Sequence, residues 1–159
     1  MKKLKGFTLI ELIVVIGIVS LFTEIFIARY NENTGQLRLR SEAKKLIDVL
    51  ELAKKKALTG DLFDKNCSNF TGYRVTITSN SYLLLFGCSS VYSTLQSYNL
   101  TTNIAVATGT GNYNFTPLII NPVFAFDTIR FKNSVINKCV DVTISPIGII
   151  ELNETLISC

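Results

Sequence analysis

Glu11 is the residue whose surroundings most need a chemical explanation, because it is a carboxylate inside the apolar run of residues 6–19. Three lysines lie within residues 2–5, directly before this run. A carboxylate deep in hydrocarbon costs about 2.5–3.5 kcal/mol even on the lenient insertion scale, and a buried charge is tolerated when it is paired. Glu11 therefore predicts a cationic partner.

The next candidates for chemistry are four cysteines, Cys67, Cys88, Cys139 and Cys159. No two of them form a C-x-x-C pair, and the chain has no histidine to complete a zinc site. Disulfides are the favoured interpretation if this part of the chain lies outside the cytoplasm, where disulfides persist. Four cysteines allow three pairings, and free buried thiols are the other alternative.

Other arrangements that carry enzyme chemistry are missing from the sequence. Without histidine, the usual Ser-His and Cys-His nucleophile systems are excluded. The acidic residues of the C-terminal part do not cluster, so no carboxylate pair for glycoside hydrolysis can be proposed. Gly109 and Gly111 are not followed by the Gly-Lys-Ser/Thr of a phosphate loop. We expect no enzyme, no cofactor and no metal site.

The net charge of +4 belongs mostly to the start of the chain. Residues 1–6 hold three of the 16 lysines and arginines, whereas all 12 acidic residues follow them. From Cys67 to Cys159 the acidic and basic residues balance. A balanced region argues against a phosphate-binding face, so nucleic acid is not an expected partner.

Residues 7–28 predict a helix that crosses a membrane, because Glu11 and Glu24 are their only charges. At ~1.5 Å rise per residue this segment covers about 33 Å, against roughly 30 Å for a bilayer core. Lysines on the N-terminal side keep that end in the cytoplasm. Everything after Arg29 is then extracytoplasmic.

Two ordinary explanations of this segment compete with a specialised one. A secretory signal peptide has a shorter, uncharged apolar region and a small-x-small cleavage site, and residues 26–28 make a poor one. A plain membrane anchor has no use for Glu11, because the carboxylate only adds cost. Both leave Glu11 without a function.

Residues 5–16 read K-G-F-T-L-I-E-L-I-V-V-I. This run resembles the class III signal of type IV pilins and type II secretion pseudopilins. The resemblance implies that a prepilin peptidase cuts between Gly6 and Phe7 and methylates the new amino terminus of Phe7. Glycine suits a cleavage site because a protease can approach its backbone closely. By position, Glu11 is the assembly glutamate, which pairs with the amine of its own Phe7 or of a neighbouring subunit.

The same resemblance implies the location and the partners. The chain would be a single-pass protein of the cytoplasmic membrane, with a cytoplasmic N-terminus, and would enter a surface or periplasmic filament. Its partners would be the prepilin peptidase, other pilin or pseudopilin subunits, the membrane assembly platform and membrane lipid. Many pilins carry a proline along this helix, and residues 17–46 have none.

A second helical pattern follows a polar stretch, residues 31–35, which either breaks the helix or is spanned by it at some cost, since it contains Gly35. Residues 37–58 carry one apolar stripe, and residues 59–61 end it with a glycine. The stripe consists of Leu39, Ala43, Leu46, Ile47, Leu50, Ala53 and Ala57. The opposite face holds lysines and arginines together with Glu42, Asp48 and Glu51. Ion pairs on a solvated face explain it better than contact with anionic lipid or DNA.

The period changes to two in the C-terminal part, which predicts a hairpin over residues 73–86 with a turn at Asn80-Ser81. Residues 109–112 are predicted as a loop and residues 145–148 as a turn. Further strands are predicted at residues 100–107, 113–120, 125–132, 139–145 and 147–152. Cys67–Cys88 and Cys139–Cys159 are the favoured pairings because each would bracket one hairpin.

The predicted fold is therefore α+β, a long N-terminal transmembrane helix that continues into an amphipathic helix packed on an antiparallel sheet head. The expected parts are a leader (1–6), a membrane and assembly helix (7–28), an amphipathic helix (29–60) and a head (61–159). Residues 38–43, 50–53 and 142–151 also resemble the H-type (GspH/FimT-like) minor pseudopilins. The predicted function is a minor pilin or pseudopilin of a type IV pilus or type II secretion system. The alternatives are a membrane-anchored extracytoplasmic binding module and a DNA-uptake minor pilin.

Overall fold

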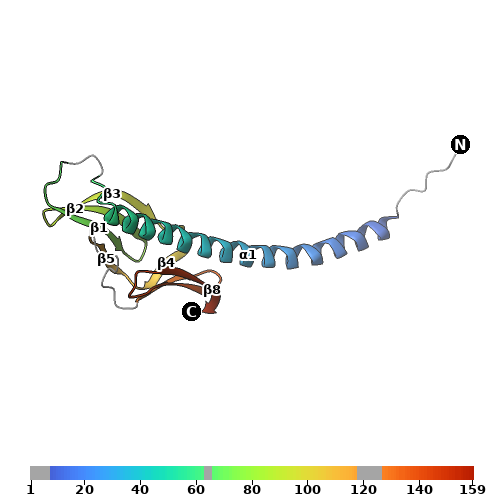
Figure 1. Ribbon diagram of the computed structural model, residues 1–159. Coiled ribbons are helices and arrows are strands. Elements are labelled where there is room, and N and C mark those ends of the chain that lie inside the picture. The colour runs from blue at the N-terminus through green and yellow to red at the C-terminus, as the bar shows by residue number, and fades with distance from the viewer. Residues whose placement is uncertain (1–7, 63–65, 118–126) are drawn as a thin grey trace. The chain divides into compact units, whose positions relative to one another are not determined.

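The computed structural model describes residues 8–62, 66–117 and 127–159, without the side chains of residues 24–28. The chain divides into two compact units, Met1–Thr34 and Gly35–Cys159. One helix, α1 (Leu9–Leu58), begins in the first unit and ends in the second, and the strands all belong to the second unit (Figure 1).

The polar stretch of residues 31–35 does not break α1. A weak helix former, Gly35, lies in this stretch because the loop after β6 packs directly on it. Asn133 donates its side-chain N–H to the Gly35 carbonyl over 3.3 Å, and a Cβ at Gly35 would lie 2.9 Å from Cγ2 of Ile136. The glycine permits this close approach of two segments.

The helix ends where the sequence predicts, in a Schellman motif. Gly60 has a φ of 65° and its N–H bonds to the Ala57 carbonyl, while the Asp61 N–H bonds to the Lys56 carbonyl. The two hydrogen bonds satisfy carbonyls that the end of the helix would otherwise leave unpaired.

The second unit, Gly35–Cys159, is called the head from here on. It holds two four-stranded antiparallel sheets with the orders β3-β2-β1-β5 and β4-β6-β7-β8 (Figure 1). The first contains β1 (Phe70–Ile77), β2 (Ser81–Cys88), β3 (Val91–Asn99) and β5 (Gly111–Phe115). The second contains β4 (Ile104–Thr108), β6 (Asp127–Asn133), β7 (Lys138–Ile144) and β8 (Ile150–Ser158). The predicted α+β class is confirmed.

The structure corrects several strand predictions. No apolar alternation marks β3, an edge strand whose side chains are mostly polar and partly exposed, and it was not predicted. The β1–β2 turn lies at residues 78–80, because Ser81 already pairs with Asn99 of β3. The predicted loop at residues 109–112 ends early, since Gly111 pairs with Ile77 of β1. Residues 118–120 and 125–126 of two predicted strands lie outside the described residues.

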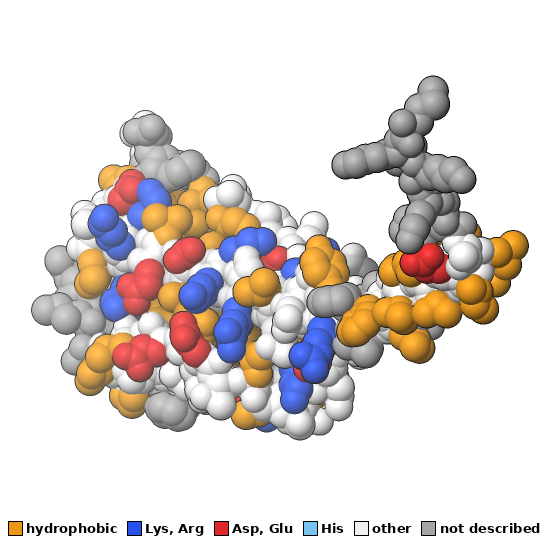
Figure 2. All heavy atoms as spheres, turned by 90° about the vertical axis from the view of Figure 1, so that its right-hand side faces the viewer, with side chains coloured by type: hydrophobic (Ala, Val, Ile, Leu, Met, Phe, Trp, Pro, Cys, Tyr) orange, Lys and Arg blue, Asp and Glu red, His pale blue; other side chains and the backbone are white. Residues whose placement is uncertain are grey.

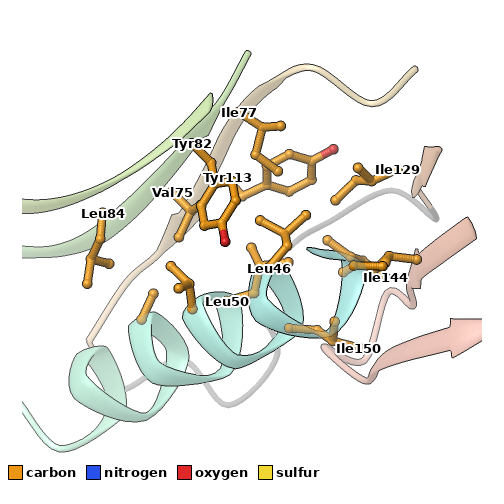
Figure 3. Close-up of a cluster of buried hydrophobic side chains, with 14 of the residues drawn as sticks. Leu46, Leu50, Val75, Ile77, Tyr82, Leu84, Tyr113, Ile129, Ile144 and Ile150 are labelled. Carbon is orange, nitrogen blue, oxygen red and sulfur yellow. The ribbon is translucent and has the colours of Figure 1, made fainter. Parts of the chain in front are cut away.

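The core forms where α1 packs on both sheets. Six of the seven predicted stripe residues are at most 1% exposed, and Ile47 is partly buried against the same cluster. Figure 3 shows helix residues beside side chains from the two sheets. The labelled residues are Leu46 and Leu50 of α1, Val75, Ile77, Tyr82, Leu84 and Tyr113 of the first sheet, and Ile129, Ile144 and Ile150 of the second.

The structure corrects the predicted solvated face of the helix, because Glu42 does not belong to it. Its side chain is buried and accepts hydrogen bonds from Thr101 Oγ1 at 2.5 Å and from Lys45 Nζ at 2.9 Å. The hydroxyl comes from the loop before β4, which a sequence pattern cannot locate. Lys54 and Glu51, by contrast, form the expected i,i+3 pair at 3.4 Å.

The two disulfides join the cysteines that the predicted hairpins bracket. Cys67 pairs with Cys88, with a Cα–Cα distance of 5.9 Å, and Cys139 pairs with Cys159 at 5.4 Å. The first links the segment before β1 to the end of β2. The second fixes the last residue of the chain to β7.

Candidate functional site

Glu11 lies in the first turn of α1, and Thr8 caps the N-terminus of this helix. The Glu11 N–H donates to Thr8 Oγ1 over 3.3 Å, and the Leu12 N–H bonds to the Thr8 carbonyl over 3.2 Å. Thr8 and Glu11 have the spacing of a capping box, a sequence signal that could have predicted where the helix begins. The cap fixes the start of the helix two residues after Phe7.

Glu11 is exposed and lies in the first helical turn, where unpaired N–H groups give the helix a partial positive charge. That charge favours a carboxylate at this position. Within the described residues, Glu11 forms no salt bridge. Its predicted cationic partner at Phe7, like the Gly6–Phe7 cleavage site, lies outside the described residues.

The segment that follows is apolar on all sides. The large hydrophobic side chains from Leu9 to Phe22 are 50–76% exposed, and Figure 2 shows hydrophobic side chains gathered along this part of α1. A helix that is apolar all round is suited to the interior of an assembly or of a membrane rather than to water. The segment is therefore a candidate for contacts with other molecules.

The polar side chains of this segment are satisfied within the helix. Ser20 donates its hydroxyl to the Ile16 carbonyl over 2.8 Å, and Thr23 donates to the Val19 carbonyl over 2.7 Å. Such bonds remove the cost of taking a hydroxyl out of water. Glu11 is then the one charged side chain among residues 8–23.

Among the described residues, no helix is both long and apolar enough to cross a bilayer. The membrane span predicted at residues 7–28 therefore stays a prediction.

The buried tyrosines of the head hold structural hydrogen bonds. Tyr73 donates its hydroxyl to the Asp61 carbonyl over 2.7 Å, and burial together with the charge of Asp61 raises its pKa to about 12. Tyr113 donates to Asp127 Oδ2 over 2.6 Å, and its pKa is also raised, by burial and then by this bond. Both phenols are neutral at physiological pH, which suits hydrogen-bond donors rather than nucleophiles. Within the described ranges no three metal-binding side chains cluster.

Comparison with known protein families identifies the N-terminal segment. Residues 1–23 match the family model of the prokaryotic N-terminal methylation motif. The searches of curated proteins and of solved structures found no match. The chain thus carries a prepilin-type methylation motif, consistent with the type IV pilin-like and pseudopilin class, and the resemblance stated from residues 5–16 is confirmed. The motif ends at residue 23, so the H-type subclass stays a prediction.

Proposed function

We propose that the chain is the precursor of a filament subunit, a minor pilin or pseudopilin, rather than an enzyme. The observation that carries the proposal is the methylation motif over residues 1–23, which includes the exposed apolar segment of α1 from Leu9 to Phe22. A prepilin peptidase cuts between Gly6 and Phe7 and methylates Phe7. The cut leaves Phe7 directly before Thr8, the residue that caps the helix.

The mature subunit is held in the cytoplasmic membrane through residues 7–28, with its head outside the cytoplasm. Two disulfides in the head support an oxidising compartment for it. Lipid covers the apolar segment before assembly, and the same segments of other subunits cover it in the filament. The assembly platform transfers the subunit from one environment to the other. The H-type resemblance favours a minor subunit of a type II secretion system or type IV pilus.

In this proposal Glu11 sets the axial register of the subunit. Its exposure and its place near the helix start support a contact with an amine, from its own Phe7 or from another subunit. A pair with the amine of a neighbouring subunit would stabilise one axial stagger of the packed helices over the others. The pair is stronger in an apolar phase than in water because the surrounding dielectric is low.

Incorporation of variants into filaments in the presence of wild-type partners tests the register role. We expect Glu11→Leu to be processed and stored in the membrane but not recovered with sheared filaments. Glu24→Leu removes the other carboxylate of residues 7–28 and should be incorporated normally. Equal incorporation of the two variants would show that Glu11 has no register role.

A further inference from the structure

The turn between β6 and β7, residues 134–137, holds an exposed apolar side chain. Val135 is 68% exposed. The side chain of buried Asn133 fixes the turn, because its Oδ1 accepts the Val135 N–H over 3.0 Å and the Ile136 N–H over 3.4 Å. On the other side, the Ser134 N–H donates to the Asn103 carbonyl over 3.0 Å. These bonds preorganise the turn, so the exposure of Val135 is a property of the fold.

The turn lies at the place where the chain enters the head. Ile136 packs on Gly35, which is the first residue of the head. In the proposed function, on which this inference rests, the membrane span ends at Ala28, seven residues before Gly35. Seven residues reach at most about 25 Å even when fully extended. The turn therefore stays close to the bilayer surface, whatever angle the two units of the chain adopt.

The turn also carries a local excess of positive charge. Lys132 and Lys138 flank it, and residues 128–140 contain no acidic residue. Among the described residues neither lysine forms a salt bridge, whereas Arg130 pairs with Asp141 at 2.7 Å. Acidic and basic residues balance over residues 67–159 as a whole, so the excess belongs to this end of the hairpin. Two free ammonium groups beside an apolar side chain suit an anionic surface with an apolar interior.

The strand register indicates a flat surface rather than a pocket. Lys132 pairs with Cys139, and Lys138 pairs with Asn133, so the two lysines project from opposite faces of the hairpin. A peptide bound on one face would meet only one of them. A plane that lies across the end of the hairpin meets both, because lysine side chains are long enough to extend past the turn.

We propose that the β6–β7 turn docks the head on an anionic lipid surface before assembly. The ammonium groups of Lys132 and Lys138 contact lipid phosphates, and Val135 enters the boundary between headgroups and acyl chains. A weak contact is sufficient, because the membrane anchor keeps the turn at a high effective concentration near the lipid. Docking fixes which end of the head faces the membrane while the subunit is stored there.

Single tryptophans test this contact, because the sequence contains no tryptophan of its own. The full chain is reconstituted in vesicles of equal amounts of phosphatidylglycerol and phosphatidylcholine, the latter with brominated acyl chains that quench fluorescence. Val135→Trp should emit at shorter wavelength than in water and should be quenched. No quenching of Val135→Trp would overturn the proposal.

Ile147→Trp is the matched control. Ile147 is also exposed, at 58%, and lies between β7 and β8, beyond the opposite end of β7. The seven residues of β7 span about 20 Å, so Ile147→Trp should stay in water and should not be quenched. Tryptophan itself favours membrane interfaces, and the control has the same bias. Equal quenching at the two positions would contradict a specific contact at the turn.

Charge variants test the role of the lysines. In the Val135→Trp chain, Lys132→Gln combined with Lys138→Gln should lower the ratio of docked to undocked heads about 25-fold, because each lysine near an anionic surface contributes about fivefold. Vesicles of phosphatidylcholine alone should have a similar effect. Lys55→Gln is the control, because it removes the same charge from an exposed position in the last turn of α1. An equal loss in Lys55→Gln would assign the effect to overall charge and overturn the proposal.

A third tryptophan separates this inference from the proposed function. Val15 lies in the apolar segment, so Val15→Trp should be quenched whether or not the head docks. Quenching of Val15→Trp without quenching of Val135→Trp would overturn the docking alone. An unquenched Val15→Trp would contradict the membrane placement of residues 7–28, and the docking with it. A Val135→Trp emission that shifts without quenching would indicate contact with another protein chain, which would also overturn docking on lipid.

Discussion

The two ends of α1 use the same secondary structure in opposite ways. From Leu9 to Phe22 the apolar side chains cover the helix on all sides and are at least half exposed, whereas from Leu39 to Ala57 most of them form one buried stripe. The second part is completed by its own chain, because both sheets pack on the stripe. In the proposed function, lipid or other subunits cover the first part. The division at Gly35 therefore separates a unit with its own buried core from an exposed apolar segment, which the proposed function assigns to assembly.

Reduction of both disulfides should have the largest effect on the head and little on the apolar part of α1. Each closes a loop of about 20 residues and should stabilise the head by about 3 kcal/mol in the chain-entropy model. Urea unfolding of the full chain in detergent, with and without reductant, measures the loss. Amide hydrogen exchange of residues 9–23 should not change, and equal destabilisation of both regions would contradict the comparison.

Leucine truncation in the two regions should give the next largest difference. Leu46 is fully buried against the sheets, so Leu46→Ala should lower the free energy of unfolding of the head by about 2–5 kcal/mol. Leu12 lies on the same helix but is 56% exposed, so Leu12→Ala should change it by less than about 0.5 kcal/mol. The same urea titration compares the two, and similar losses would show that the N-terminal segment also belongs to the head's core.

The two glycines of the helix, Gly35 and Gly17, should show the same contrast with smaller changes in the free energy of unfolding. A methyl group at Gly35 would press on Ile136, and this overpacking should outweigh the gain in helix propensity by about 1 kcal/mol. At Gly17 nothing lies within 4 Å of the position that a Cβ would take, so Gly17→Ala should leave the head's stability unchanged. Thermal unfolding of the two variants decides this. A more stable Gly35→Ala head would mean that the loop at Ile136 yields easily.

Alkaline pH should affect the head alone, through tyrosines whose pKa is raised. The Tyr73 phenol loses its proton near its ordinary pKa of 10 in the unfolded chain but only at about 12 in the folded one. The unfolded chain then holds fewer protons, so stability is full below pH 10 and falls as pH rises towards 12. Unfolding between about pH 9 and pH 12 measures the slope, and Tyr73→Phe should reduce it. An unchanged slope in the variant would assign the effect to other groups.

Local periodicity and short motifs carry the features that could be predicted before folding is considered. The stripe of α1, the helix end at Gly60, the β1–β2 hairpin and both disulfides follow from such patterns. The roles of Glu42 and Gly35 could not be predicted from such patterns. They depend on Thr101 and Ile136, which only the tertiary fold brings to the helix. Strand β3 lacks an apolar period because it lies at a sheet edge, where both faces are partly exposed.

The same limit on prediction applies to the functional sites. The methylation motif was recognisable because it is contiguous in sequence. The surface at the β6–β7 turn was not, because Asn133 and Gly35, which hold the turn on the helix, are 98 residues apart. A contiguous motif can be read from one sequence, whereas a surface of this kind exists only after folding.

Mass spectrometry of the N-terminal peptide tests most directly whether the apolar segment is released from a leader for use in assembly. The chain is isolated from cells that contain its prepilin peptidase. We predict a chain that begins at Phe7 and carries one methyl group on its amine, and Gly6→Leu should block this processing. A chain that retains residues 1–6 in those cells would contradict the proposed processing and favour a plain membrane anchor.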